Sequence, residues 1–500
     1  MGKSRTVISG ISWTIIQNLT NILYGIVSVP FLINYFGNEE YGLIGIATSV
    51  NVYVQLLDLG MTNSVVKFLS ESLEKKESDK TQKLFSFTFS FYTILGLLNT
   101  IILIILSLFT DKLFNVTPNQ ALTLRNLFLV LSANATFSWI SVCVDQILYA
   151  DELISWSRKR MTFLKLFQFV ILLATLYMKL SIEAYFFCYV FLATLIMPVS
   201  IHKIKKVLPY LKFAYKIDVE TVKLILPYIF GIFSFSIFQF VASSTRPVVL
   251  GNIIGPSAVT EYTIISTIAS VVVMITGTFT QVLIPVITKM KTSGNEEGIT
   301  IVINKGTEYA NYLISLIVFL IIVSVSDILS LYVGKNFIHL STWCTIWLCM
   351  LLLSHRNVLT SMVYAQSRLR SITIMGAFAM LVALISYYFL VPKFGVGGVI
   401  IGYLFHDVIH TLFYYSYFYP KILNRNLKFL FSRRIMPTWF CAAILCLAIH
   451  YLVIFENNYI NIIVKSLLFV IFYIFSILYL INRKEDRTFM YAFVLNSIKR

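Results

Sequence analysis

Charged residues are scarce in this 500-residue chain, since Asp, Glu, Lys and Arg make up 13% of it and apolar residues 58%. A soluble fold of that composition could not cover its hydrophobic surface with polar side chains. Acidic residues are the scarcer kind, with 23 Asp and Glu against 40 Lys and Arg. The composition therefore predicts an integral membrane protein rather than a soluble domain.

Motifs for nucleotide or covalent chemistry are missing. No loop carries G-x-x-x-x-G-K followed by Ser or Thr, so the sequence offers no cradle for the phosphates of ATP. The H-E-x-x-H, G-x-S-x-G and zinc-ligand spacings are also missing. We therefore expect no ATP hydrolysis, no resident cofactor and no metal site.

Cysteine is rare and lies only in apolar segments, without a C-x-x-C pair and without a pair in an expected outer loop. Such cysteines are interpreted as small apolar core residues rather than as redox or metal-binding groups. The six cysteines are Cys143, Cys188, Cys344, Cys349, Cys441 and Cys446.

Fourteen apolar segments follow one another, and most reach the ~20 residues that cross a ~30 Å hydrocarbon core as a helix. The first has no cleavage site of small residues and is interpreted as a retained span rather than a signal peptide. The segments are 12–34, 41–66, 85–109, 121–150, 161–178, 182–201, 222–249, 257–287, 306–333, 341–365, 371–391, 396–419, 435–455 and 459–481.

Basic residues occupy every second gap between these segments. With a cytoplasmic N-terminus, the inner loops and termini hold 32 Lys and Arg residues and the outer loops only four. Such an imbalance fixes the orientation and predicts both termini in the cytoplasm. It also accounts for the net charge of +17, because the inner loops face anionic lipid, so we expect no nucleic-acid partner.

The outer loops are too short to hold a domain, which argues against a membrane polymerase or a lipid-linked glycosyltransferase. Glu39 and Glu40 in the first outer loop could still form the metal-binding acidic pair of a membrane enzyme. The favoured interpretation is that both complement the positive end of the following helix. The sequence therefore predicts a protein that is not an enzyme.

Ionisable residues inside the expected spans differ in how strongly they indicate a functional site. Each costs at least ~2.5 kcal/mol near the bilayer centre, so such residues mark candidate functional sites. Arg125 and Lys465 lie near span ends and can snorkel to the headgroups, whereas Asp145 and Glu308 can pair with inner-loop cations. These four are the weaker candidates, although Arg125 stays among the substrate-binding residues that we predict.

Deeper in the spans lie Arg246 after a run of hydroxyl residues, Arg356 next to a histidine, and Asp407. His406 and His410 share one helix face through their i, i+4 spacing. The two arginines can line a hydrated lumen, or Arg356 can form a structural ion pair with Asp407. Both interpretations remain open from the sequence.

Uncharged polar side chains and one carboxylate extend this expected lumen. Gln17, Asn18, Asn21 and Ser28 are set among apolar residues of the first segment, and Asp58 lies in the second. The expected substrate-binding residues of the lumen are Arg246, Arg356, Arg125, Gln17, Asn18 and Asn21. The expected ion-coupling candidates are Asp58, Asp407 and His410.

The chain also contains a weak internal duplication, in which a span, a glycine and a second span recur around Gly37 and Gly255. We therefore expect an all-α polytopic membrane protein of about 14 transmembrane helices, with two six-helix lobes at 1–216 and 217–420 and two further helices in 421–500. Paired six-helix bundles around a site at the bilayer midplane are a common transporter plan.

Three motifs carry a resemblance to a known family. Residues 36–43 are followed by Leu-Asp-Leu-Gly at 57–60 and by Lys67, and Phe-Gly-Val-Gly-Gly at 394–398 lies before the twelfth span. This order resembles Wzx-type polysaccharide flippases of the multidrug, oligosaccharidyl-lipid and polysaccharide exporter superfamily. The chain departs from the family pattern at Lys67, where relatives often have arginine, so a single charge replaces a bidentate group.

The resemblance implies a flippase for undecaprenyl-diphosphate-linked oligosaccharides, the precursors of O-antigen, capsule or a similar surface glycan of lipopolysaccharide-type pathways. It implies the bacterial plasma (inner) membrane, lipid and lipid-linked substrate as partners, and a polysaccharide polymerase and a chain-length regulator as candidate partners. Without an ATPase motif, a proton or Na+ gradient is a candidate energy source. A peptidoglycan-precursor flippase and a drug/cation antiporter remain alternatives, although a lumen rich in arginine argues against the antiporter.

Overall fold

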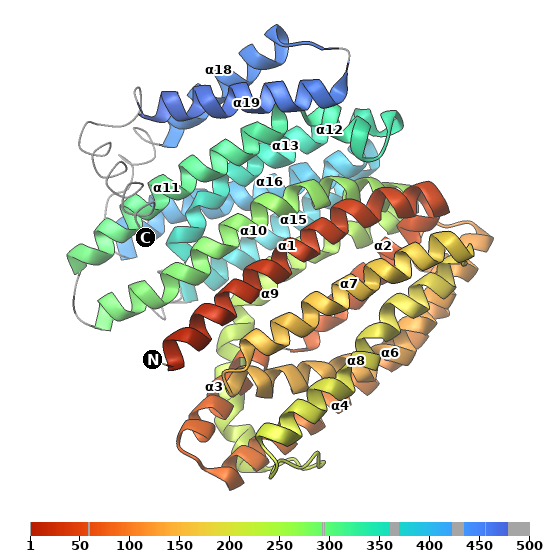
Figure 1. Cartoon of the computed structure of the whole chain (residues 1–500), viewed down its shortest axis with the longest axis vertical. Helices are drawn as coiled ribbons and strands as arrows, with labels where there is room; N and C mark the ends of the chain where they lie inside the picture. The colour runs from red at the N-terminus through yellow and green to blue at the C-terminus, as the bar shows by residue number, and fades with distance from the viewer. Residues whose placement is uncertain are drawn as a thin grey trace. The chain divides into compact units, whose positions relative to one another are not determined.

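The computed structural model describes residues 2–58, 61–292, 294, 296–360, 370–422, 435–455 and 457–478. Within these ranges all regular secondary structure is helical (Figure 1). Each expected segment coincides with one helix or with consecutive helical pieces, apart from the few residues outside the described ranges. The expected all-α fold is confirmed.

The chain divides into two compact units, each made of two stretches of sequence. The units are Met1–Thr267 with Ala383–Gly402, and Ile268–Val382 with Tyr403–Arg500. The unit boundaries cut three helices, which are α10 (Pro256–Thr292), α15 (Arg370–Phe394) and α16 (Val396–Phe413). The expected lobe boundaries after residues 216 and 420 lie elsewhere, so the division into two lobes and a C-terminal pair stays a prediction.

The first unit contains the helices of the first seven expected spans. They are α1 (Gly2–Phe36), α2 (Asn38–Val54), η1 (Gln55–Asp58), α3 (Met61–Glu74), α4 (Ser78–Ser107), α5 (Thr110–Leu113), α6 (Pro118–Ala150), α7 (Ile154–Met178), α8 (Ile182–Val207) and α9 (Val219–Ile253). Polar caps start several of them. At α6, Thr117 accepts from the backbone N–H of Gln120 and the Gln120 side chain accepts from that of Thr117, which satisfies two amides that the helix leaves open.

The second unit contains shorter helical pieces. They are α11 (Glu296–Ile322), α12 (Val325–Tyr332), the 3-10 segment η2 (Lys335–Leu340), α13 (Ser341–Leu351), the 3-10 segment η3 (Leu352–Arg356), the π-helical segment η4 (Tyr414–Ile422), α18 (Met436–Leu452) and α19 (Asn458–Ser476). Both C-terminal helices are tied to α11: Trp439 Nε1 donates to Asn311 at 2.7 Å and Tyr473 Oη donates to the Tyr312 carbonyl at 2.8 Å.

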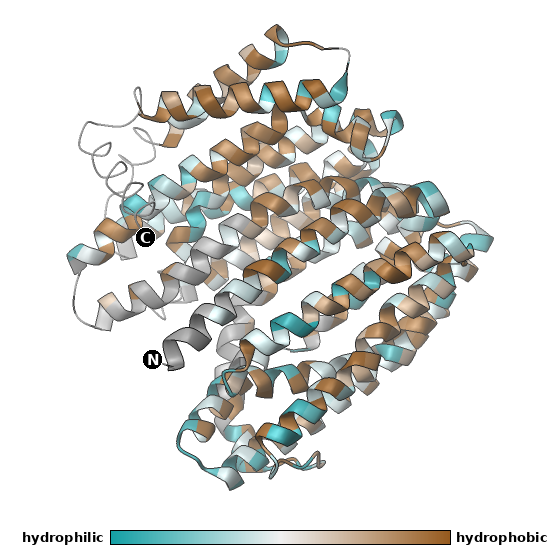
Figure 2. Ribbon diagram, viewed as in Figure 1, coloured by the Kyte–Doolittle hydropathy of each residue, from teal (hydrophilic) through white to brown (hydrophobic). Residues whose placement is uncertain are grey.

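The surfaces of these helices are apolar where a soluble protein would be polar. Among the described residues, eleven helices are long and apolar enough to cross a membrane, and α18 is a shorter apolar helix. Tyr177, Leu195 and Leu452 are 90%, 72% and 83% exposed. Figure 2 shows hydrophobic residues along the middles of the helices. The chain is thus a multi-pass membrane protein.

Alternate loops gather at opposite ends of the first unit. At one end, Tyr35 Oη donates to the Leu180 carbonyl at 3.1 Å, and the Asn115 amide donates to the Gly251 carbonyl at 3.1 Å. At the other, which we call the basic end, the Gln82 side chain donates to the Lys212 carbonyl at 2.8 Å. The basic end is formed by the loops that follow α3, α6 and α8. Which end faces the cytoplasm stays a prediction.

The glycines of the internal duplication adopt backbone conformations that other residues rarely adopt. Gly37 has φ +90° and Gly255 has φ +124°. A Cβ added at Gly255 would lie 2.8 Å from the Asn115 carbonyl oxygen, and one added at Gly42 would collide with the Pro256 backbone. Gly42 therefore permits close contact between α2 and the start of α10.

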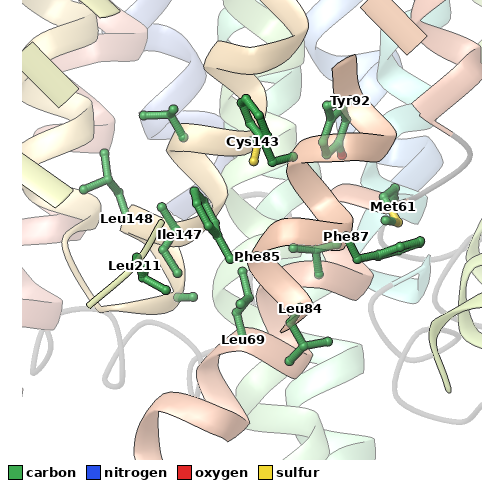
Figure 3. Packing of buried hydrophobic residues seen from close by; sticks show 14 of the residues in the cluster. Met61, Leu69, Leu84, Phe85, Phe87, Tyr92, Cys143, Ile147, Leu148 and Leu211 are labelled. Atoms are coloured by element: carbon green, nitrogen blue, oxygen red, sulfur yellow. The ribbon is translucent and has the colours of Figure 1, made fainter. Parts of the chain in front are cut away.

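A hydrophobic cluster fills the basic end of the first unit, where α3, α4 and α6 pack together (Figure 3). Phe85 and Cys143 are fully buried in it, and Phe213 from the loop after α8 packs its ring 5.1 Å from that of Phe85. Tyr92 belongs to this cluster, so close helix packing fixes its ring and with it the hydroxyl that donates to Asp58.

Candidate functional site

A buried ion pair joins η3 to α16 within the second unit. Arg356 Nη2 lies 2.5 Å from Asp407 Oδ1, while Nη1 donates to the Asp407 carbonyl at 3.1 Å and to Thr411 Oγ1 at 3.0 Å. Arg356 and Asp407 are 9% and 4% exposed. The structure thus contains the ion pair that the sequence left open as the alternative to a lumen arginine. A role for Arg356 in substrate binding stays a prediction.

Histidines surround this pair. His406 is fully buried and its Nδ1 lies 3.4 Å from Asp407 Oδ1. Its ring is 4.4 Å from that of His410 and stacks at 5.0 Å on Tyr403. The i, i+4 spacing therefore places both imidazoles on one helix face beside a carboxylate that already pairs with a guanidinium, as expected. Asp407 and His410 stay predicted ion-coupling residues.

Arg246 lies in α9 of the first unit and is 8% exposed. Its Nε donates to the Ser243 carbonyl at 2.9 Å, and its guanidinium lies 5.6 Å from the ring centroid of Tyr262 on α10. The preceding hydroxyl residue Thr245 lies with its Oγ1 3.1 Å from Tyr53 Oη on α2. The run of hydroxyl residues therefore joins α9 to α2.

Arg125 is placed differently from the other two arginines. It lies in the second turn of α6, and its side chain is exposed. An exposed guanidinium near a helix end is the geometry of a residue that snorkels to the headgroups. Its predicted part in substrate binding gains no support from this position.

The polar residues of the first segment form a stripe that faces α7. The Gln17 side-chain oxygen accepts from Arg158 Nη1 at 2.9 Å. Asn18 is partly exposed, and Asn21 Oδ1 is buried with no hydrogen-bond partner among the described residues. Figure 1 shows α1 and α7 side by side. Gln17 is therefore placed at the α1–α7 interface, where a polar ligand could reach it.

Asp58 ends η1 and holds a network of neutral donors. Its Oδ1 accepts from Tyr92 Oη at 2.5 Å and from Thr62 Oγ1 at 3.1 Å, and its Oδ2 accepts from the Thr62 amide at 3.3 Å. Gln146 Nε2 donates to Tyr92 Oη at 2.6 Å. No cation pairs with Asp58 among the described residues, so its partners are hydrogen-bond donors rather than a lumen arginine.

In the described part of the chain, three further ion pairs involve charges inside the expected spans. Asp145 accepts from Arg160 Nη2 at 2.8 and 2.6 Å, which confirms the expected pairing of this acid with a cation of the basic loop. Glu308 lies 3.8 Å from Lys305. Lys465, 4% exposed, lies 3.4 Å from Asp327 on α12 instead of snorkelling to the headgroups, because α19 packs against α12.

One feature that the sequence analysis missed is an aromatic cage around Lys165 on α7. Lys165 Nζ lies 4.8 Å from the ring centroid of Tyr24 and 5.6 Å from that of Tyr189, and it donates to Tyr189 Oη at 3.3 Å. Lys165 lies inside the expected span 161–178, and its spacing of seven residues from Arg158 places both on one face of a helix. The aromatic partners come from other helices, so the sequence carries no signal for the cage.

The described residues hold no group of three or more His, Cys, Asp or Glu side chains arranged to bind a metal ion. Two candidate sites lie within the first unit, one around Arg246 on α9 and one around Gln17 and Lys165 where α1 meets α7. Together they are built from cations, phenols and amides. Among the described residues, the buried acids Asp145 and Asp407 pair with Arg160 and Arg356 rather than with the cations of these two sites. Such surroundings suit an anionic, hydroxyl-rich ligand better than a cation.

Comparison with protein families now identifies the chain. The model of a family described as polysaccharide biosynthesis protein matches residues 7–291. The chain belongs to this family. The matched region contains the α1 stripe, Asp58, Lys165 and Arg246, whereas Arg356 and Asp407 lie beyond it. None of the curated proteins matches the sequence.

Solved structures with the same fold include a lipid flippase and multidrug transporters. This polysaccharide biosynthesis family member resembles the lipid II flippase MurJ in an inward closed conformation, with a TM-score of 0.72 and 14% identity over 94% of this chain and 99% of MurJ. It also resembles an inward-facing MATE multidrug resistance transporter of the MOP superfamily, with a TM-score of 0.64 and 16% identity over 81% of this chain and 95% of the transporter. A third similar structure is a Vibrio cholerae MATE transporter, with a TM-score of 0.58 and 11% identity over 82% of this chain and 95% of the transporter. At identities this low, the similarity shows only that these proteins share a fold with this chain.

Proposed function

We propose that the chain is a flippase that moves undecaprenyl-diphosphate-linked oligosaccharides from the inner to the outer leaflet of a bacterial plasma membrane by alternating access. The observation that carries the proposal is its membership of a polysaccharide biosynthesis family combined with a transporter fold. The glycan would be the repeat unit of an O-antigen, a capsule or a similar surface polysaccharide. Both termini would lie in the cytoplasm.

The physical problem of this reaction supports the assignment. A diphosphate and several sugars cannot cross hydrocarbon unaided, because neither the charges nor the hydroxyl groups find partners there. A helical protein with buried cations and amides supplies those partners. Arg246 and the polar stripe of Gln17, Asn18 and Asn21 would serve the diphosphate and sugars, with Arg125 and Arg356 as further candidates.

Energy for directional transport would come from an ion gradient, the membrane potential or removal of the product. Asp407 and His410 flank the buried Arg356, so a proton taken up there would compete with the ion pair. Asp58 is the second candidate, since its carboxylate is held by neutral donors that a protonated acid could also engage. A polymerase and a chain-length regulator would act on the transported product.

Two alternatives share the fold. A peptidoglycan-precursor flippase would also need buried cations, and the likeness to MurJ favours it as the second candidate. A drug/cation antiporter would favour unpaired acidic groups. Among the described residues the buried acids Asp145 and Asp407 pair with arginines, which argues against it.

The test is transport of a defined lipid by the purified full chain. Proteoliposomes would carry a fluorescent undecaprenyl-diphosphate-linked oligosaccharide, and dithionite would quench only the outer-leaflet fluorophore. We expect complete quenching with the protein and half quenching in empty vesicles. Excess peptidoglycan lipid precursor should compete poorly, since strong competition would favour the second candidate. Half quenching with well-folded protein would contradict the proposal.

A further inference from the structure

Lys165 carries an ammonium group whose described contacts are with tyrosines. Its Nζ contacts the faces of Tyr24 and Tyr189 and the Tyr189 hydroxyl, and no carboxylate lies within ion-pair distance of it among the described residues. Its side chain is only partly exposed, in the fourth turn of α7. Cation–π contacts contribute about 0.5–2 kcal/mol each, which only partly offsets the cost of an ammonium that is partly removed from water. An anion in contact with Lys165 would complete this site.

The rings around Lys165 form a continuous aromatic surface. Tyr24 and Tyr189 stack with their centroids 6.3 Å apart, and Tyr185 lies 5.9 Å from Tyr189. The hydroxyls of Tyr24 and Tyr185 are 3.3 Å apart. Aromatic faces of this kind accept the C–H faces of sugar rings, and phenol hydroxyls bind sugar hydroxyls. The cage therefore joins groups for a sugar to a group for an anion.

Buried polar atoms beside the cage also lack protein partners. Gln168 lies one turn after Lys165 and is 5% exposed; its Nε2 donates to the Tyr189 carbonyl at 3.3 Å, but its Oε1 has no hydrogen-bond partner among the described residues. The same holds for Asn21 Oδ1, one turn before Tyr24 on α1. Two turns before Lys165, Arg158 Nε is buried and has no hydrogen-bond partner in the part of the chain that the structure describes. Since unpaired buried polar atoms are costly, they indicate a polar ligand or water at this face.

The register of α1 and α7 places these groups along one line. Gln17 faces Arg158 and Tyr24 faces Lys165, and each pair is separated by 141 residues in the sequence. The two helices therefore run parallel. Seven residues at 1.5 Å per residue set Arg158 and Lys165 about 10 Å apart along the helix. Two cations at this separation can contact two parts of one extended ligand.

We propose that Lys165, Tyr24 and Tyr189 form a binding subsite for a sugar ring that carries a phosphoryl or carboxylate group. The ammonium binds the anionic group and the two rings stack on the sugar. The subsite rests on the proposed function and specifies the chemistry of the substrate. The anion belongs either to the diphosphate next to the first sugar or to an acidic sugar further along the glycan.

Lys159 offers a matched control on the same helix. Its Nζ lies 5.0 Å from the ring centroid of Trp13, but its side chain is exposed, so bulk water already solvates the ammonium. If Lys165 served only to bind α7 to its neighbours through aromatic contacts, neutralising either lysine should affect stability alone. A ligand role predicts a loss of affinity for Lys165 and none for Lys159.

The experiment measures binding by the full chain in lipid nanodiscs. The probes are undecaprenyl diphosphate, the same lipid with one N-acetylglucosamine, and the same lipid with a disaccharide that ends in glucuronic acid. Wild type, Lys165→Gln, Lys165→Arg, Tyr189→Leu and Lys159→Gln are compared, with thermal unfolding measured without lipid. We expect Lys165→Gln and Tyr189→Leu to weaken binding of a glycosylated probe at least tenfold. Lys165→Arg should retain most of the affinity and Lys159→Gln all of it.

The pattern of losses identifies the source of the anion. Weaker binding of both glycosylated probes assigns the site to the sugar next to the diphosphate, and weaker binding of the glucuronate probe alone assigns it to an acidic sugar. Equal affinities of wild type and both Lys165→Gln and Tyr189→Leu would overturn the subsite while leaving the proposed function intact. Failure of the wild type to bind any probe would overturn the proposed function and the subsite with it.

Discussion

The guanidinium of Arg356 and the carboxylate of Asp407 form a buried pair in which both Nη atoms of the arginine are used, one on the carboxylate and one on the carbonyl of the same aspartate. The pair joins η3 to α16 across 51 residues of sequence. A contact that uses the main chain as well as the side chain fixes the guanidinium in one orientation. It is therefore a structural element of the second unit, whatever further role the arginine has.

The first prediction concerns this pair. Arg356→Met or Asp407→Leu alone should destabilise the protein by about 3–5 kcal/mol, because each leaves one uncompensated buried charge. The double variant should recover most of the lost stability, since it replaces both charges by apolar groups of similar volume. Thermal unfolding in detergent measures this. Equal damage in the double variant and the single variants would contradict a purely structural pair.

Surface glycan produced by cells with the double variant then separates the two roles of Arg356. If the pair is only structural, the double variant should export glycan as the wild type does, when both proteins are present in the membrane in equal amounts. If Arg356 also contacts substrate or Asp407 takes up a proton, the double variant should be folded but inactive. If Arg356 contacts substrate, Arg356→Lys should retain some export, because one point charge still meets the ligand.

The second prediction concerns Asp58, whose carboxylate accepts from Tyr92, from the Thr62 hydroxyl and from the Thr62 amide. Asp58→Ala should abolish most glycan export, since it leaves three donors unpaired. Asp58→Asn should fold almost normally, because an amide oxygen still accepts. Export by Asp58→Asn decides between roles: retained export indicates a structural acceptor, and lost export in a folded protein indicates a titrating carboxylate. Tyr92→Phe, which removes one donor, is the matched control and should export.

Hydropathy located the spans but not the breaks within them. The second apolar segment is uninterrupted in sequence, whereas in the structure α2 ends at Val54 and α3 starts at Met61. Asp58 explains the break, because its side chain accepts from the Thr62 amide and so competes with continuous helix bonding. A single polar residue in an apolar run does not reveal in advance which backbone group it will bind.

Contacts between helices that are distant in sequence could not be fixed from the sequence, so the ion pair of Arg356 with Asp407 was one of two open interpretations. The sequence places Arg356 and Asp407 inside spans, but nothing in it says which helices are neighbours. The same limit applies to Lys165, which lies near the start of the expected span 161–178 and close to the basic residues of the preceding loop. Its aromatic partners come from α1 and α8, so the cage is a property of the packing. The positions of the helices can be predicted from the local sequence, whereas these two sites can be found only once the packing of the helices is known.

The third prediction uses two glycines with opposite surroundings. A Cβ at Gly96 on α4 would lie 2.6 Å from Thr136 Cα on α6, whereas one at Gly277 on α10 would meet nothing within 4 Å. Gly96→Ala should therefore destabilise the protein by about 1–3 kcal/mol through overpacking. Gly277→Ala should stabilise it by about 0.5–1 kcal/mol, because alanine loses less backbone freedom in a helix. Thermal unfolding of both variants checks the sign, and destabilisation by Gly277→Ala would contradict the open surroundings of that helix face.

The last prediction concerns the orientation in the membrane. Reporter fusions after Lys80, Lys206 and Arg425 should report the cytoplasm, and fusions after Asn115 and Lys335 should report the outside. The reason is the 32 to 4 distribution of basic residues between the two sets of loops. The first unit adds a physical constraint, since Asn115 lies at the end opposite to Lys212 and the basic loops. Fusions after Lys80 and Lys206 must therefore agree with each other and differ from the one after Asn115. Reversal of all three would invert the protein and leave the fold intact, whereas reversal of one alone would contradict the fold of the first unit.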